Sequence, residues 1–206
     1  KHPLSLALAK KALTLGEAKF AKNSENITNL QYNLADAYAN NKKYLSAFKT
    51  MALVTESYKT LYGEHSEQLF QAILSQLDHY PNKRVHSVED KDEILQPLVE
   101  QAIDIAEQLV TQKPDISHVI YYLLSKQISK KTIFPSVRKQ AAHYSQLAYE
   151  GLLNKLGSQN VQTLEAQFRL AGLEYNARKF HRAAELFEAL VTNIESSIDT
   201  SHPYEL

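Results

Sequence analysis

The sequence contains no cysteine. A disulfide framework, a zinc–thiolate site, an iron–sulfur cluster and a cysteine nucleophile are therefore excluded. Because stray thiols are a liability in an oxidising space, this absence slightly favours an exported protein of the bacterial periplasm. A cytoplasmic protein can also lack cysteine, so the compartment is open between these two.

Glycine and proline are scarce, with 5 and 6 residues among 206, whereas average usage is roughly 7% and 5%. This scarcity favours helices over a turn-rich all-β fold. Hydrophobic residues make up 44% of the chain and charged residues 22%, which is typical of a globular protein and too apolar for a disordered one. The length suits one extended domain or two small ones.

Neither sign of charge is in excess, because 23 basic residues balance 23 acidic ones. No whole-molecule field attracts nucleic acid or an anionic membrane surface. The longest apolar run, residues 119–124, is far shorter than the roughly 20 residues of a membrane span. We expect no nucleic-acid partner and no membrane insertion.

Signatures of catalysis are also missing. The few glycines are too scattered for a phosphate-binding loop or a dinucleotide-binding fingerprint. His181 and Glu185 lie one helical turn apart but have no third ligand nearby in the sequence, so we interpret them as an exposed helical pair worth about 0.2–0.5 kcal/mol. We predict no catalytic, metal-binding or cofactor-binding residues, and a protein that is not an enzyme.

Short polar segments divide the chain at regular intervals. His202, Asn160 and His118 are 42 residues apart in turn, and the same step back from His65 reaches Asn23. The interval from His65 to His118 is 53 residues, and its surplus coincides with the polar residues 81–90. This period indicates a repeat architecture with one loop insertion.

Each period contains two helices by its apolar spacing. In the first, residues 26–40 carry one helical pattern, residues 40–43 interrupt it, and a second pattern starts at Tyr44. Pro97 follows the insertion, and we expect it either in the first turn of a helix that starts late or at a kink.

Residues at the breaks predict helix ends. Asp115 and Asn160 stand where an N-cap is wanted, and Gly63 and Gly157 stand just after helices.

Two stretches carry a family resemblance. Residues 32–38 (YNLADAY) followed by residues 42–47 (KKYLSA) resemble the tetratricopeptide repeat (TPR), and residues 61–65 (LYGEH) and 201–203 (SHP) resemble its long-period subset in kinesin light chains. The similarity is strong over residues 23–80 and good over residues 160–206. Residues 118–157 depart from the pattern.

The resemblance implies an all-α fold, an α-α superhelix (right-handed solenoid) of antiparallel helix pairs with about four TPR-like repeats. Small residues such as Ala35 and Ala47 let paired helices approach closely, and we expect Tyr38, Tyr80 and Tyr175 to fill the wedge between successive repeats.

The predicted organisation is a single repeat domain over residues 1–206. A preceding helix (1–22) is followed by repeats at 23–64, 65–113 with the insertion 81–90, 114–157 and 158–199, and residues 200–206 start a further unit. Because stacked repeats need capping ends and neither end looks capped, we expect a piece of a longer protein.

The first helix of each pair is expected to line the concave face, the usual binding surface of such solenoids. We take the residues beside Leu34 and Tyr38 on the first helix and find their equivalents in later repeats by adding the repeat period. Together they predict a groove with carboxylates toward one end and cations toward the other. Tyr121 and Tyr122 are further candidate contacts. The predicted partner-binding residues are Asn29, Tyr32, Asp36, Gln71, Leu74, Asp78, Gln127, Lys131, Arg169, Leu173 and Asn176.

This groove suits an extended or helical peptide, because amide side chains can meet its main chain. TPR domains that clamp a chaperone's C-terminal carboxylate have Lys and Asn where this chain has Tyr32 and Asp36, which argues against that ligand. We predict a non-catalytic scaffold for a protein or peptide partner. The alternatives are a self-associating assembly module, in which uncapped ends form a homo-oligomer, and a peptide-sensing regulatory domain.

Overall fold

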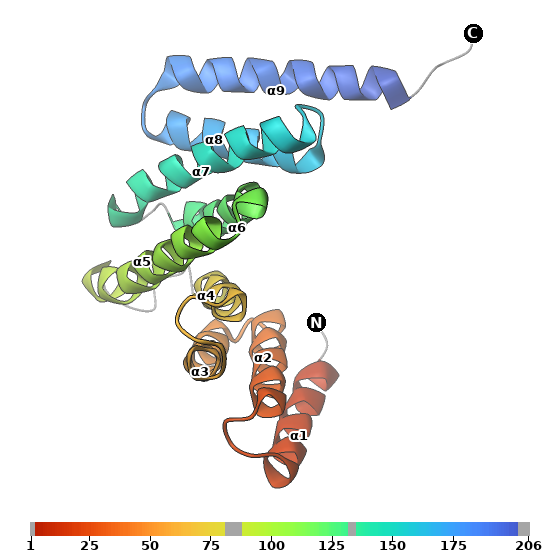
Figure 1. Ribbon diagram of the computed structural model, residues 1–206, viewed down its shortest axis with the longest axis vertical. Coiled ribbons are helices and arrows are strands. Elements are labelled where there is room, and N and C mark those ends of the chain that lie inside the picture. The colour runs from red at the N-terminus through yellow and green to blue at the C-terminus, as the bar shows by residue number, and fades with distance from the viewer. Residues whose placement is uncertain (1–2, 81–87, 132–134, 202–206) are drawn as a thin grey trace. The chain divides into compact units, whose positions relative to one another are not determined.

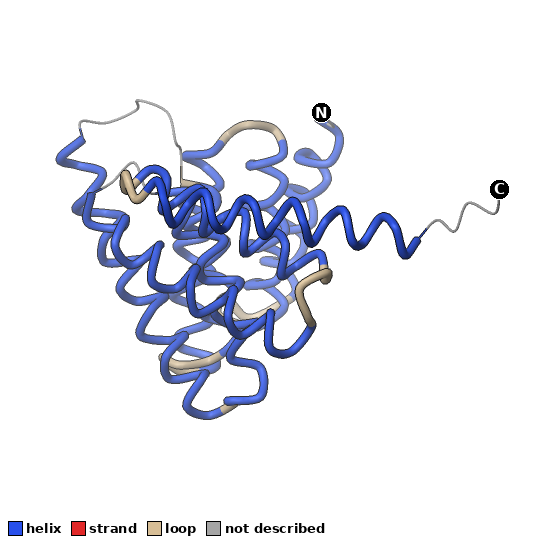
Figure 2. The backbone as a smooth tube through the Cα atoms, turned by 90° about the horizontal axis from the view of Figure 1, so that it is seen from above, coloured by secondary structure: helices blue, strands red, loops and turns tan. Residues whose placement is uncertain are grey.

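The computed structural model describes residues 3–80, 88–131 and 135–201, and these ranges are helical with no strand. Short loops connect the helices (Figure 2). The all-α prediction is thus confirmed. The described elements are α1 (Pro3–Lys19), α2 (Glu25–Asn40), α3 (Tyr44–Tyr62), α4 (Glu67–His79), α5 (Val88–Gln112), α6 (Ser117–Ile128), α7 (Pro135–Leu156), α8 (Val161–Asn176), α9 (Phe180–Ser201) and two short 3₁₀ turns, Pro114–Ile116 and Ser129–Lys131.

The chain divides into two compact units, Lys1–Leu109 and Val110–Leu206, with the boundary in the last turn of α5. In the first unit α1 packs on α2, α2 on α3 and α3 on α4. In the second unit α6 packs on α7, α7 on α8 and α8 on α9, while α6 also touches α8 (Figure 1). We call α2, α4, α6 and α8 the first helices of their pairs.

Polar side chains cap the N-terminal ends of several helices, and glycines follow the C-terminal ends of others. The side chains of Ser24, Ser66 and Asn160 accept hydrogen bonds from the backbone N–H groups of residues 27, 69 and 162, at 3.4, 3.3 and 2.9 Å. Gly63 and Gly157 follow α3 and α7 with φ of 91° and 83°, a region that glycine enters without steric cost. The predicted N-cap at Asn160 and the predicted glycine ends at Gly63 and Gly157 are confirmed, whereas the caps at Ser24 and Ser66 are additional findings.

Two expectations about helix ends fail. Asp115 lies inside the 3₁₀ turn, and α6 starts after Ile116 with no side-chain cap, because that turn supplies the local hydrogen bonding instead. The late start at Pro97 is also wrong, since α5 begins at Val88 and Pro97 lies inside it. Of the expected loop insertion 81–90, residues 81–87 lie outside the described residues, and residues 88–90 are helical.

Small and aromatic residues pack the repeats. Ala35 and Ala47 are fully buried, and Tyr80 is buried with its ring edge-on to Phe48 at 5.2 Å between centroids. Tyr175 does not fill a wedge between repeats, because its ring lies against Phe180 of its own helix pair at 5.4 Å and is 58% exposed.

The helices α6 and α7 approach closely at Gly151. A Cβ atom on this residue would lie 2.8 Å from the Cβ and 3.2 Å from the Cα of His118. The absence of a side chain at Gly151 therefore permits the observed spacing of the two helices.

Candidate functional site

In the first unit, side chains of α2 reach α4 along the predicted groove stripe. The Tyr32 hydroxyl lies 2.6 Å from the Ser75 hydroxyl. One turn further, Asp36 Oδ1 lies 3.3 Å from His79 Nε2. The structure thus joins two predicted groove residues to polar partners on the next first helix.

The other predicted residues of the first unit divide by exposure. Asn29 accepts a hydrogen bond from the Tyr58 hydroxyl of α3 at 2.8 Å. Gln71 and Asp78 are exposed on α4. Leu74 is only 4% exposed, so its place in the groove is wrong: it faces inward and contributes to packing.

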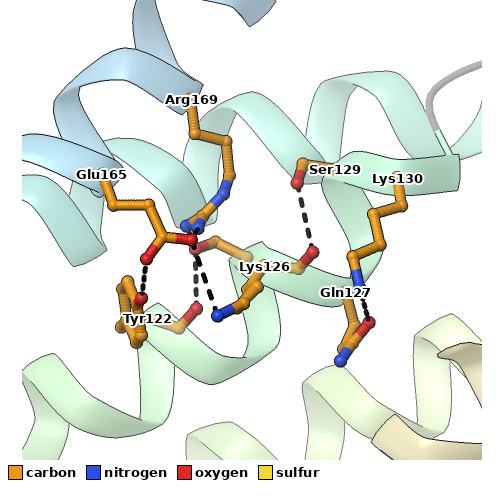
Figure 3. Close-up of polar contacts among 8 residues, drawn as sticks. Tyr122, Lys126, Gln127, Ser129, Lys130, Glu165 and Arg169 are labelled. Atoms are coloured by element: carbon orange, nitrogen blue, oxygen red, sulfur yellow. Dashed lines mark hydrogen bonds and ion pairs between the residues drawn. The ribbon is translucent and has the colours of Figure 1, made fainter. Parts of the chain in front are cut away.

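In the second unit, five side chains of α6 and α8 form one contact network, which we call the α6–α8 cluster. Its members come from one stripe of each helix (Figure 3). They are Tyr122, Ser125 and Lys126 of α6, and Glu165 and Arg169 of α8.

The Glu165 carboxylate is at the centre of this cluster. It accepts a hydrogen bond from the Tyr122 hydroxyl. Its other oxygen lies 3.1 Å from a guanidinium nitrogen of Arg169 and 3.5 Å from Lys126 Nζ. One carboxylate therefore neutralises one of two cations, and the cluster carries a net positive charge.

Both cations of the cluster, Lys126 and Arg169, lie over the ring of Tyr122. The Arg169 guanidinium lies 5.2 Å and Lys126 Nζ 5.6 Å from the ring centroid, within the range of cation–π attraction. Arg169 also donates to the Ser125 hydroxyl at 3.1 Å. These contacts hold the charged groups in fixed positions before any ligand arrives.

The contacts change the acidity of two groups. The hydrogen bond from Tyr122 is the main cause that lowers the pKa of Glu165, and both cations act in the same direction. Burial is the main cause that raises the pKa of Tyr122, and its hydrogen bond to Glu165 adds to this. Near neutral pH the pair is thus a charged acceptor and a neutral donor.

Exposure differs sharply within the cluster. Tyr122 is 6% exposed and the Arg169 side chain 12%. The side chains of Lys126 and Glu165 are 41% and 43% exposed. Tyr122 is buried and Arg169 is largely shielded from solvent, whereas Lys126 and Glu165 are partly exposed.

The same spacing connects first helices in both units. Tyr32 and Ser75 are 43 residues apart, as are Tyr122 and Glu165. Ser125 and Arg169 are 44 apart. Polar pairs between successive first helices are therefore a repeated feature of this chain.

Several predicted residues of the second unit lie elsewhere. Lys131 is fully buried and Leu173 is 6% exposed, so neither is part of an open groove. Leu173 lines a cavity beside α7, because its side of α8 faces that helix. Gln127 is half-buried and accepts from Lys130 at 3.1 Å, and Asn176 is exposed at the end of α8.

Sequence reasoning found Arg169 and considered Tyr122, but it missed Lys126 and Glu165. The available signal was the spacing of four residues that separates Tyr122 from Lys126 and Glu165 from Arg169. This spacing places each pair on one helical face.

Among the described residues, no group of three or more potential metal ligands comes together. None of the described helices combines the length and the apolar character needed to cross a membrane. His181 and Glu185 form an exposed pair at 3.3 Å.

The fold is that of a TPR-like helical repeat protein. It is similar to the crystal structure of a Podosopora anserina protein described as a kinesin light chain with nearly identical TPR-like repeats, with a TM-score of 0.68 and 14% identity over 91% of this chain and 84% of that one. The crystal structure of a point variant of that protein gives a TM-score of 0.71 and 13% identity over 94% and 87%. The resemblance to this repeat class is thus confirmed for the fold.

No protein-family model matches the sequence, and no curated protein matches it. The similarity to solved structures therefore defines the fold of this chain, a TPR-like helical repeat.

Proposed function

We propose that this protein is a non-catalytic scaffold that binds a peptide or protein segment on the faces of its first helices. The observation that carries this proposal is the α6–α8 cluster, in which the partly exposed side chains of Lys126 and Glu165 contact buried Tyr122 and largely buried Arg169. A cation and a carboxylate held side by side suit a partner with polar main-chain groups and charges of both signs.

The first unit offers a second surface of the same kind. Its α2 and α4 stripes carry Asp36 beside His79, with exposed Gln71 and Asp78. Carboxylates at this surface favour a basic partner segment, whereas the net positive α6–α8 cluster favours an acidic one.

A pull-down with two double variants of the full chain tests the proposal. Gln71→Lys with Lys126→Gln changes one exposed first-helix residue in each unit. Gln108→Lys with Lys155→Gln makes the same changes on α5 and α7, where Gln108 and Lys155 are also exposed. Arg169 is left intact, because its side chain is 12% exposed and supports the cluster.

Proteins captured from an extract of the source cell are compared by mass spectrometry. We expect partners of the wild-type chain to be retained by the α5/α7 variant and lost from the first-helix variant, with melting temperatures unchanged. Equal capture by both variants would show that the first helices are not the binding surface.

Self-association is a second candidate function, and it is favoured by exposed aromatic residues on α8 and α9. Phe168, Tyr175 and Phe180 are 62%, 58% and 57% exposed, and the rings of Tyr175 and Phe180 are in contact at 5.4 Å between centroids, so these two form a shared apolar surface. Light scattering over a concentration series tests this candidate. A molar mass that stays at the monomer value for the wild-type chain would rule it out. A wild-type mass that rises with concentration, together with a Phe168→Gln mass that does not, would support it.

We further propose that the protein is exported, on the ground of its cysteine-free composition. Fractionation of the source cell would test this, and recovery with cytoplasmic markers would refute it.

A further inference from the structure

A cavity of about 550 Å³ opens between the first half of α7 and the C-terminal end of α8. Arg138, Lys139, His143 and Gln146 come from α7, and Glu174 and Lys179 come from the end of α8 and the turn after it. The two ends meet because α7 and α8 are consecutive and run in opposite directions. The volume lies within the roughly 300–1,000 Å³ of ligand-binding pockets.

The cavity is cationic although the whole chain has no net charge. Glu174 Oε2 lies 2.9 Å from Lys179 Nζ, so this carboxylate balances one cation. The charged lining residues are therefore Arg138, Lys139 and Lys179 with the single carboxylate of Glu174. An anionic group entering here meets complementary charge.

Apolar groups form the remainder of the lining. Ala142 of α7 and Leu173 and Ala177 from the α8 side are all in contact with the cavity. A single inorganic anion would fill a small part of such a space and leave these groups uncovered. A segment with carboxylates on methylene stems would occupy both the cationic and the apolar parts.

We propose that this α7–α8 cavity binds an acidic segment of a protein partner, whose Asp or Glu carboxylates pair with Arg138 and Lys139. The site is separate from the α6–α8 cluster, since its charged residues belong to α7 and to the end of α8. It stands whether or not the first helices bind a partner.

Two peptides and one ion test the site on the full chain by amide NMR. The peptides are acetyl-tetraglutamate amide and acetyl-tetraglutamine amide, and the ion is inorganic phosphate. We expect tetraglutamate to shift the amides of Ala142, Gln146 and Ala177, while tetraglutamine at the same concentration leaves them in place. Lys139→Glu should weaken tetraglutamate binding about tenfold, a change of about 1.4 kcal/mol.

The matched control is Lys155→Glu, an exposed lysine of the same helix that lies 16 residues further on, about 24 Å at the helical rise. Equal weakening by the two variants would show only general charge attraction and would overturn the proposal. Phosphate binding more tightly than tetraglutamate would mark an ion site instead of a peptide site. Shifts confined to Lys126 and Arg169 would assign the acidic segment to the first helices, and no shifts would refute both assignments for this peptide.

Discussion

Glu165 depends on its neighbours for its acidity. Its carboxylate accepts from the Tyr122 hydroxyl and faces Lys126 and Arg169. Because the pKa of Glu165 is lowered, its contacts stabilise the fold above the ordinary glutamate range and are lost as the pH falls through the folded value. The raised pKa of Tyr122 affects stability in the alkaline range. The contribution of neutral Tyr122 to the stability of the fold is complete below a pH of about 10 and is lost as the phenol ionises.

Tyr122→Phe should therefore raise the pKa of Glu165 toward its ordinary value, since the hydrogen bond from Tyr122 is the main cause of the lowering. The measurement is a pH titration of the Glu165 side-chain carboxyl carbon by NMR. Tyr149→Phe, which removes a hydroxyl from α7, serves as the control and should leave the titration where it is. An unchanged Glu165 titration in Tyr122→Phe would mean that the two cations alone set its acidity.

Helix packing gives a prediction at the scale of elements. Gly151→Ala adds a Cβ that meets the Cβ and Cα of His118 at 2.8 and 3.2 Å, atoms that move only with the α6 backbone. Better helix propensity contributes about 1 kcal/mol, and overpacking costs about 1–3 kcal/mol. We expect a net loss of stability in urea unfolding.

Gly172→Ala is the matched control, because a Cβ on this α8 residue meets nothing within 4 Å. It should stabilise the protein by about 0.4–1 kcal/mol. If Gly151→Ala stabilises to the same extent, the close approach of α6 and α7 is not limiting.

Helix boundaries were largely predictable from the sequence, and the reasons are local. Asn160 was predicted as a cap, and its side chain reaches the backbone N–H group two residues further on. The predicted N-cap at Asp115 is wrong because a 3₁₀ turn takes the place of a side-chain cap. The predicted late helix start at Pro97 is wrong because α5 begins nine residues before it. The sequence around the insertion does not determine where α5 begins.

At the scale of the whole molecule, the described helices of each unit pack on their neighbours in sequence, so a local change should have a local effect. In native-state hydrogen exchange, Gly151→Ala should reduce amide protection in α6 and α7 and leave α2 and α3 unchanged. A uniform loss of protection across both units would show that they unfold as one cooperative body.

The candidate site was harder to predict at this scale than the fold. The stripe beside Leu34 and Tyr38 selects Tyr32 and Asp36 on α2, and both side chains reach α4. In the divergent middle repeat the projection chose Lys131, which is fully buried, whereas the Lys126 side chain is 41% exposed. A shift of a few residues in register turns a helix face, and apolar spacing alone does not reveal such a shift.

Packing between consecutive helices also allows the chain to fold while it is being translated. Contacts that are close in sequence allow folding in microseconds to milliseconds, whereas a ribosome adding about 5–20 residues per second needs roughly 2–8 seconds for a 42-residue repeat. Within each unit, a helix can therefore dock on the one before it while the next is still being translated. A nascent chain stalled once α3 has left the ribosome should already protect α2 from protease.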